Sequence, residues 1–371
     1  MTYGSIDQLQ KALSADVFGD RTDSKKAAGR ALGTILELIS YYLIDAWNFS
    51  KGTSIELRVP EYGNSEITHN VEFALHPING SENISLSGLT LPITSAKIFQ
   101  ISRFQNLPNE YRKNSQLISK REVVRNAAVI YSSPKDLIIA RYKDNECAVL
   151  THLDPIPYAI VECKRVGVED GAKKGPTTIE KAKQGAYVAK SVSRLQKFRG
   201  IDGQLMGIYP KDNGEYEIQE YQVELDRIIN NPDGEFATGL NLSIGIVSNH
   251  GNWFTDEKLN KELLVLKSSY DWLLFMSDEA MIKFVTDLLI DPNPKFSAVS
   301  NAFTASYRPG KKENMFTKVK IQKNADLALR NYFSQNMGEI EKWFTVLQPE
   351  YKNINDLKIT LEKLSKRKAN I

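Results

Sequence analysis

The chain has 371 residues, of which 42% are hydrophobic and 25% are charged, as in an ordinary globular protein. This composition excludes a disordered or collagen-like chain, and the length predicts either one large elaborated core or two domains. A formal net charge of +3 neither requires nor excludes a polyanionic partner.

The first predicted element is an amphipathic helix at residues 24–47, in which Leu32, Ile35, Leu36 and Ile39 repeat at helical spacing. Short apolar runs broken by Pro, Gly and Asn then predict strands between residues 53 and 104, at 54–59, 70–75 and 96–101. Two further strands are expected at 126–132 and directly after Asp136, followed by a loop at 143–157.

The segment at 158–166 (YAIVECKRV) is apolar where it begins and charged where it ends, as in a buried strand that emerges at a site. A loop rich in Gly and Lys and a helix at 177–198 follow it. Strands are predicted at 204–210 and 240–254, and a helical region at 256–290. A basic loop and further helices complete the chain.

This order of elements predicts an α/β protein with a central mixed β-sheet flanked by helices, to which β-rich and C-terminal helical elaborations are added. We expect a core at residues 1–290 with a β-rich insertion at about 50–108. Residues 291–371 are expected to form a C-terminal basic and helical region that binds DNA or mediates dimerisation.

Two further expectations concern the cellular setting. Cys147 and Cys163 are the only cysteines, and without CxxC spacing they predict neither a disulfide framework nor a structural zinc site. The first twenty residues lack the apolar segment of a signal peptide, and no stretch is long enough to span a bilayer. We therefore expect a cytoplasmic protein without a membrane partner.

The strongest chemical signal is the tripeptide Glu162-Cys163-Lys164. Because side chains alternate along a strand, Glu162 and Lys164 share one face and Cys163 lies on the other. A carboxylate from a neighbouring strand, for which Asp136 is the candidate, would complete an oxygen ligand set for Mg²⁺ with Glu162 and the Cys163 carbonyl. Lys164 would then hydrogen-bond an attacking water and a phosphate.

These residues resemble the PD-(D/E)XK nucleases, and within them the type II restriction endonucleases. That family places an Asp, commonly after Pro, at the start of one strand and E-x-K on the next strand of the sheet. Here Pro134-Lys135-Asp136 and Glu162-Cys163-Lys164 take these places, with Lys135 interrupting the Pro-Asp step. The resemblance implies a restriction-endonuclease-like core, Mg²⁺, and sequence-specific cleavage of double-stranded DNA that leaves 5′-phosphate ends.

The resemblance extends to two flanking helices. Many members carry a Glu on a helix before the sheet, a position that Glu37 matches, and Glu37 is expected to contact a metal-bound water. The helix after E-x-K often bears a Gln and an aromatic residue facing the site, like Gln184 and Tyr187. Such enzymes usually act as homodimers, which matches a palindromic target.

Basic residues near the motif are candidates for DNA contact. After the motif these are Lys173, Lys174 and Lys181, together with Gln184. Near residue 310, basic and aromatic residues interleave, and Arg308, Lys311 and Lys312 are the expected phosphate contacts, with Lys318 and Lys320 nearby. The sequence contains no GxxxxGK[ST] segment, so no nucleotide cofactor is expected.

Several alternatives stay open at this point. Asp154 competes with Asp136 as the partner carboxylate, and an acid two residues before a Lys can also be a surface ion pair. A structure-specific repair, recombination or phage-derived nuclease and a non-catalytic DNA-binding protein on the same fold are the alternative functions. The sequence specifies neither the recognition sequence, nor the cut position, nor the oligomeric state.

Overall fold

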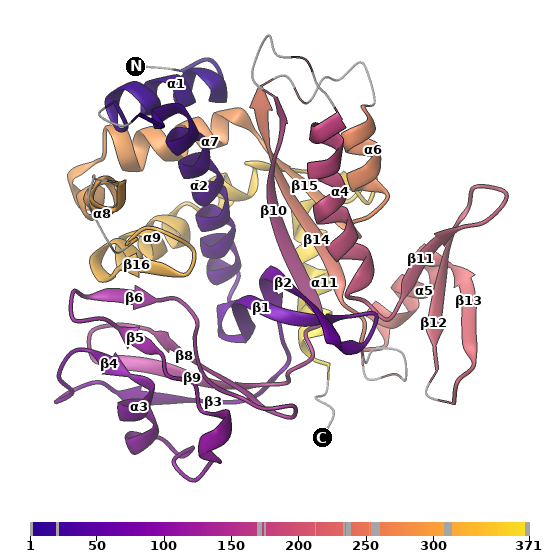
Figure 1. Ribbon diagram of the computed structural model, residues 1–371, viewed down its shortest axis with the longest axis horizontal. Helices are drawn as coiled ribbons and strands as arrows, with labels where there is room; N and C mark the ends of the chain where they lie inside the picture. Colours follow the sequence, from indigo (N-terminus) through magenta and orange to yellow (C-terminus); the bar gives the residue numbers. More distant parts are fainter. Residues whose placement is uncertain are drawn as a thin grey trace.

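The fold is built around a central six-stranded sheet with the order β1-β2-β10-β14-β15-β17 (Figure 1). The computed structural model describes residues 3–19, 22–168, 173, 176–211, 213–232, 234, 239–251, 253, 260–307 and 314–367, with the backbone alone at 176–178 and 181. The strands of this sheet are β1 Thr53–Glu61, β2 Asn64–Leu75, β10 Ala159–Val168, β14 Leu242–Gly251, β15 Trp272–Met276 and β17 Phe344–Gln348.

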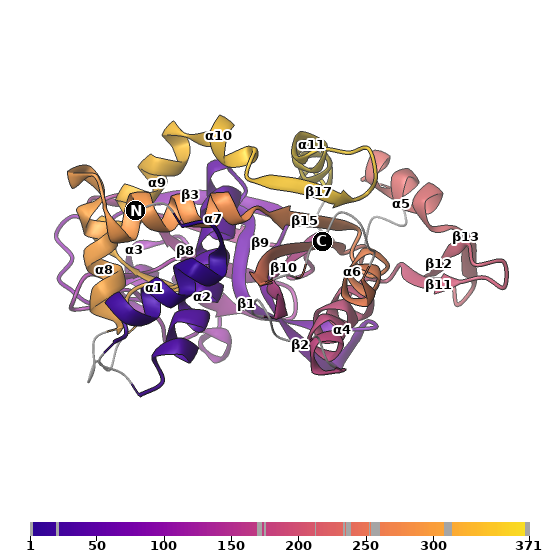
Figure 2. The ribbon, with the colours of Figure 1, turned by 90° about the horizontal axis from the view of Figure 1, so that it is seen from above.

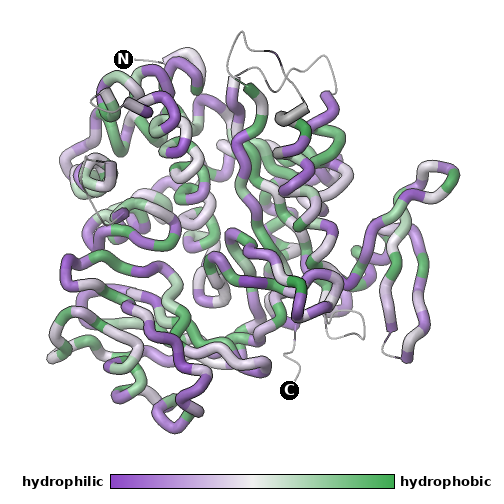
Figure 3. The backbone as a smooth tube through the Cα atoms, viewed as in Figure 1, coloured by the Kyte–Doolittle hydropathy of each residue, from purple (hydrophilic) through white to green (hydrophobic). Residues whose placement is uncertain are grey.

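The sheet is mixed, as the sequence predicted. Strands β1, β2 and β10 pair antiparallel, β10, β14 and β15 pair parallel, and β17 returns antiparallel to β15. Strand β15 is wholly apolar and β14 is buried over its first seven residues, as expected for strands covered on both faces. Figure 3 shows this hydrophobic character along the strands that the helices enclose.

Helices cover both faces of the sheet. Helices α2 (Ser24–Ala46) and α11 (Ile354–Ser365) pack on the face that carries Val161 and Ile246. Helices α4 (Pro176–Ser191) and α6 (Lys261–Lys267) cover the other face, opposite α11 in Figure 2. The remaining helices around α2 are α1 Ile6–Asp16, α7 Asp278–Val285, α8 Ser297–Tyr307, α9 Lys323–Gln335 and α10 Met337–Glu341.

A β-rich insertion lies between β2 and β10 in the chain and below α2 in Figure 1. It forms two four-stranded sheets, β3-β9-β8-β7 and β16-β6-β5-β4, which enclose a separate small core. Only β16 comes from outside the insertion. The elements are β3 Ile78–Ser85, β4 Ile93–Thr94, α3 Ser95–Ile101, β5 Gln116–Ile118, β6 Val123–Arg125, β7 Ala128–Ser132, β8 Leu137–Tyr142, β9 Cys147–Leu153 and β16 Lys320–Gln322.

A three-stranded arm projects from the body at the right of Figure 1. It consists of β11 Gln196–Arg199, β12 Leu205–Pro210 and β13 Tyr216–Glu220, and α5 Tyr221–Asn230 follows it. Short helical turns occur at Ser50–Gly52, Asn109–Tyr111, Thr286–Ile290 and Pro294–Phe296. None of the helices in the described ranges combines the length and apolar character needed to cross a lipid bilayer.

The structure confirms the α/β class, the long helix at 24–47 and the strand at 158–166, but it corrects several local predictions. The predicted strand at 96–101 is helix α3, because the Thr94 side chain caps it by accepting from the Lys97 amide. The expected loop at 143–157 contains β9, and the helical region at 256–290 contains β15. Short apolar runs such as β15 do not distinguish strand from helix by periodicity.

The expected division of the chain also differs from the arrangement seen. Strands β1 and β2 belong to the central sheet, so the inserted β-rich part runs from Ile78 to Leu153 rather than over 50–108. The segment after residue 290 adds β17 to the central sheet and β16 to the insertion. This C-terminal segment therefore belongs to both the core and the insertion.

A buried arginine joins the insertion to the core. Arg141 on β8 donates hydrogen bonds to Tyr41 Oη on α2 at 2.9 Å and to the carbonyl of Asn126 at 2.8 Å. It also donates to the carbonyl of Thr53, where β1 begins. A guanidinium that satisfies acceptors from three segments fixes the insertion against α2 and β1.

We predict that Arg141→Met lowers the free energy of unfolding by about 3 kcal/mol, because buried acceptors at Asn126 and Thr53 lose their donor. Urea denaturation followed by circular dichroism measures the change. Lys143→Met, at an exposed position just after β8, is the control and should change stability by less than about 0.5 kcal/mol. Equal stability of the two variants would contradict the role given to Arg141.

Candidate active site

Strands β2 and β10 separate at the position where each carries a glutamate. Their pairing ends at Phe73 and Val161, one residue before Glu72 meets Glu162. Beyond this point each carboxylate bonds the backbone of the other strand. Glu162 Oε1 accepts from the Glu72 amide at 3.1 Å, and Glu72 Oε2 accepts from the Cys163 amide at 2.7 Å. The divergence therefore holds the buried carboxylate of Glu162 beside the largely buried carboxylate of Glu72, whose side chain is 14% exposed.

Lys164 lies on the same face of β10 as Glu162, as the strand alternation predicted. Its Nζ is 3.3 Å from Glu162 Oε2 and 3.7 Å from Glu72 Oε1. Burial lowers the pKa of Lys164, but the carboxylates of Glu72 and Glu162 more than offset this and leave the pKa above its ordinary value. Lys164 is thus a charged ammonium that is still partly open to solvent.

A second lysine approaches Glu72, but not Glu162, from the C-terminal part of the chain. Lys318 Nζ lies 3.0 Å from Glu37 Oε2, 3.8 Å from Glu56 Oε1 and 3.9 Å from Glu72 Oε1. Its side chain is only 8% exposed. Glu37 projects from α2, so the site combines residues from a helix, from the three strands β1, β2 and β10, and from the segment before β16.

The backbone of β1 is strained beside this site. Glu56 has a φ of 53°, in the left-handed region that residues other than glycine rarely adopt. Its neighbours Ile55 and Leu57 pair with Phe73 and Val71, so Glu56 lies opposite Glu72. Backbone strain of this kind costs about 1–3 kcal/mol and is concentrated at functional sites.

Glu72 is the most perturbed carboxylate of the site. Burial raises its pKa to about 7; Lys318 and Lys164 oppose the shift, while Glu37 and Glu162 add to it. A carboxylate with such a raised pKa is ionised more readily when a further positive charge lies beside it. Perturbation of this kind is typical of functional sites.

Tyr270 packs beside Lys164 in space that two glycines leave free. Gly245 pairs with Glu162 in the sheet, and a Cβ there would lie 2.9 Å from the Tyr270 ring. A Cβ at Gly185 on α4 would lie 2.8 Å from the Tyr270 hydroxyl and 3.5 Å from Cε of Lys164. The hydroxyl is buried and has no hydrogen-bond partner among the described residues. Burial first, and then Glu162 and Glu72, raise the pKa of Tyr270 and keep it protonated.

The prediction that the Asp136 strand adjoins the Glu162 strand is wrong. Asp136 precedes β8, which pairs with β7 and β9 in the insertion and not with β10. Its carboxylate bonds His152 Nε2 at 2.7 Å. The competing Asp154 is also occupied elsewhere, since Oδ1 accepts from the Ile156 amide.

Glu72, and not Asp136, is the carboxylate that lies beside Glu162 on the neighbouring strand. The signal for it is present in the sequence, because V-E-F-A-L at 71–75 places an acid inside an apolar strand as A-I-V-E-C does at 159–163. In the sequence, Lys318 is distinguished only as part of a basic loop. Tyr270 and Glu56 have no signal that would distinguish them from ordinary core and surface residues.

The other predicted residues lie as follows. Cys163 faces α2 and donates its thiol to Ser40 Oγ at 3.3 Å, on the opposite face from Glu162 as predicted. Gln184 is exposed on α4, and Tyr187 donates to Glu61 Oε2 at 2.6 Å rather than to the carboxylate pair. Lys173 is exposed. Lys174, Arg308, Lys311, Lys312 and the Lys181 side chain lie outside the described residues.

The donor chemistry of the site suits a hard divalent cation. Glu72 and Glu162 offer carboxylate oxygens, which are the ligands that Mg²⁺ prefers. In the described ranges no group of three or more His, Cys, Asp or Glu side chains converges as a ready-made metal shell. At this site the lysines stand among the carboxylates, so an ion would enter beside Lys164 and Lys318.

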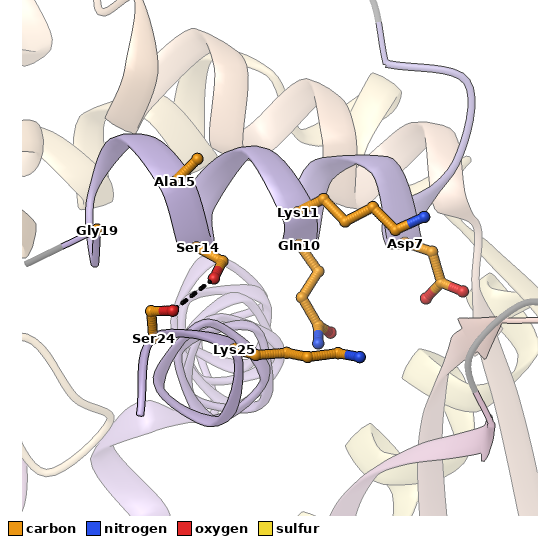
Figure 4. A pocket seen from close by; sticks show the side chains of 8 residues that line it. All are labelled: Asp7, Gln10, Lys11, Ser14, Ala15, Gly19, Ser24 and Lys25. Carbon is orange, nitrogen blue, oxygen red and sulfur yellow. Dashed lines mark hydrogen bonds between the residues drawn. The ribbon is translucent and has the colours of Figure 1, made fainter. Parts of the chain in front are cut away.

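A separate hollow of about 490 Å³ opens between α1 and α2 (Figure 4). Ser14 and Ser24 meet there at 3.0 Å, and Asp7, Gln10 and Lys25 line it. It contains none of the residues of the carboxylate site. We find no arrangement in it that resembles a reactive centre.

Comparison with known proteins gives no relative, because no family model, curated protein or solved structure matches this chain.

We predict that Glu72→Gln stabilises the metal-free protein at pH 8 but not at pH 5. Because the folded protein raises the pKa of Glu72, the favourable contribution of its protonated form is complete below about pH 4.5 and is lost as the pH rises through about 7. A glutamine removes this loss and still accepts from the Cys163 amide. Thermal unfolding in EDTA at the two pH values measures the effect.

Glu66→Gln is the matched control, because Glu66 is exposed on the same strand. The melting temperature of Glu72→Gln should exceed that of the wild type by a few degrees at pH 8 and should equal it at pH 5. A Glu72→Gln protein that is less stable than the wild type at pH 8 contradicts the prediction.

Proposed function

We propose that this protein is a Mg²⁺-dependent endonuclease of the PD-(D/E)XK type that cleaves double-stranded DNA, as a type II restriction endonuclease does. The observation that supports the proposal most strongly is the pair Glu72 and Glu162, held with Lys164 where two antiparallel strands diverge. A surface ion pair does not require one buried and one largely buried carboxylate beside a lysine on the same face. The arrangement fits a site for phosphodiester hydrolysis.

The order of elements agrees with the family resemblance. Helix α2 with Glu37 comes first, an antiparallel pair of strands follows, and E-x-K lies on the next strand of the same sheet. Two departures remain: the acid before E-x-K is a Glu rather than an Asp, and the whole β-rich insertion separates the two strands. Glu and Asp supply the same ligand atoms, so the chemistry is preserved.

Glu72 and Glu162 would hold the Mg²⁺, with the Cys163 carbonyl as the third ligand that the resemblance implies. When bound, the ion supplies charge neutralisation at the phosphate and lowers the pKa of a bound water. Glu72, whose pKa the fold raises to about 7, carries the negative charge for which the ion is the natural partner.

Three side chains of the protein would act around the scissile phosphate. Lys164 donates hydrogen bonds from a charged ammonium, which orients the attacking water and neutralises charge that develops on the phosphate oxygens. Glu37 accepts a hydrogen bond from water on the α2 side. Tyr270 keeps a buried hydroxyl as a donor below Lys164.

We predict that the purified protein cuts plasmid DNA in Mg²⁺ and not in EDTA. Glu162→Gln and Lys164→Met should each lower the cleavage rate by about 10²-fold or more, because one removes a ligand and the other removes the donor to the water and phosphate. Glu66→Gln and Lys51→Met, both exposed, are the controls and should cleave like the wild type.

The substrate pattern of this experiment separates the functional alternatives. Discrete fragments from a sequenced plasmid support restriction, and preferential cleavage of branched or single-stranded DNA supports a repair or recombination nuclease. DNA binding without Mg²⁺-dependent cleavage, or cleavage that persists in both site variants, overturns the enzyme proposal.

The assignment of Glu72, rather than Asp136, as the partner carboxylate of Glu162 gives a second test. Glu72→Gln should lose cleavage to the same extent as Glu162→Gln, whereas Asp136→Asn should retain it, because Asp136 bonds His152 in a different sheet. Initial rates on a single plasmid at one Mg²⁺ concentration measure both. Loss of cleavage in Asp136→Asn, with a melting temperature like that of the wild type, would restore Asp136 as the partner carboxylate.

A further inference from the structure

Lys318 is a buried lysine that the mechanism above does not use. Its ammonium faces the carboxylates of Glu37, Glu56 and Glu72 at 3.0, 3.8 and 3.9 Å. Burial lowers the pKa of Lys318, but Glu72 and Glu37 outweigh it and keep the group charged. A charged lysine is rarely buried unless it is paired, and here it has three partners.

The backbone around Lys318 is fixed by the insertion. The side-chain amide of buried Asn126 donates to the Lys318 carbonyl at 2.8 Å, and the Asn126 amide donates to the Val319 carbonyl at 3.0 Å. Directly after this point β16 pairs with β6. The main chain of Lys318 is thus fixed by hydrogen bonds to Asn126, and its ammonium is fixed by the carboxylates. The fold therefore determines the position of the whole residue.

The net charge of the site matches that of one divalent ion. At pH 8, above the pKa of about 7 to which burial raises Glu72, four carboxylates, on Glu37, Glu56, Glu72 and Glu162, share the site with two ammonium groups, on Lys164 and Lys318. Four negative and two positive charges leave a net charge of −2. One divalent ion neutralises this charge. Without Lys318 the net charge would be −3, and Glu37 and Glu56 would lose the ammonium that pairs with them in the described part of the chain.

We propose that Lys318 occupies the place of a second cation, so that the chain binds a single divalent ion at Glu72 and Glu162. This inference rests on the metal-dependent nuclease proposed above. Lys318 is a positioning residue in this scheme, because it acts through Glu37 and Glu72. It holds the Glu72 carboxylate from the side of α2 while Lys164 approaches the same oxygen from β10.

Counting bound Mn²⁺ tests the proposal without relying on cleavage. Titration calorimetry and electron paramagnetic resonance of the full-length protein at pH 8 should give one ion for the wild type and two for Lys318→Ala. Lys318→Arg keeps the positive charge and should bind one ion. Lys320→Ala, which removes an exposed lysine two residues away, is the matched control and should also bind one ion.

Cleavage measured against Mg²⁺ concentration gives a second readout. The wild type should respond with a Hill coefficient near one, and Lys318→Ala should respond more steeply and cleave at least about tenfold more slowly at low Mg²⁺. If Lys318→Ala does not fold, Lys318→Met, which keeps a long apolar side chain at the buried position and removes the charge, replaces it and should also bind two ions.

The outcomes separate this inference from the proposed function. Two ions on the wild type, or one ion on a folded Lys318→Ala protein, overturn the role of Lys318 and leave the nuclease proposal intact. A wild type that binds no Mn²⁺ overturns both. One ion on the wild type that Glu162→Gln abolishes, together with two ions on Lys318→Ala, supports both.

Discussion

The reciprocal bonding of Glu72 and Glu162 across two diverging strands is the interaction on which the site depends. Each carboxylate accepts from a backbone amide of the opposite strand, so the amides stay satisfied although the ladder has ended. This bonding holds the strands apart and fixes both carboxylates at once. Lys164, two residues along β10, places its ammonium 3.3 Å from Glu162 and 3.7 Å from Glu72.

The surrounding elements hold β2 and β10 in this diverging arrangement. Gly245 and Gly185 make room for the Tyr270 ring beneath Lys164, and α4 closes over it. On the α2 side, Arg141 fixes the insertion to Tyr41 and Thr53. Through Asn126 the insertion in turn fixes the segment that carries Lys318. The insertion and the segment that carries Lys318, both distant from β10 in the sequence, therefore determine the charges around Glu72.

The site is maintained at a cost in stability. It contains a carboxylate whose pKa is raised to about 7, a glutamate with left-handed backbone and a phenol without a partner among the described residues. Each of these features is unfavourable for a protein that only has to fold. Their concentration within one group of neighbouring residues is the physical argument that the group has a chemical role.

The sequence by itself determined the α/β class, the helix that carries Glu37 and the strand that delivers Glu162 and Lys164 to one face. These features are local, because helical and strand periodicities place side chains on faces without knowledge of distant residues. Only the tertiary structure decided which carboxylate stands beside Glu162. Periodicity gives the face of a strand but not its neighbour, and Glu72 lies 90 residues away across an inserted domain. Lys318 is more distant still, and its place depends on a strand that pairs with that same insertion.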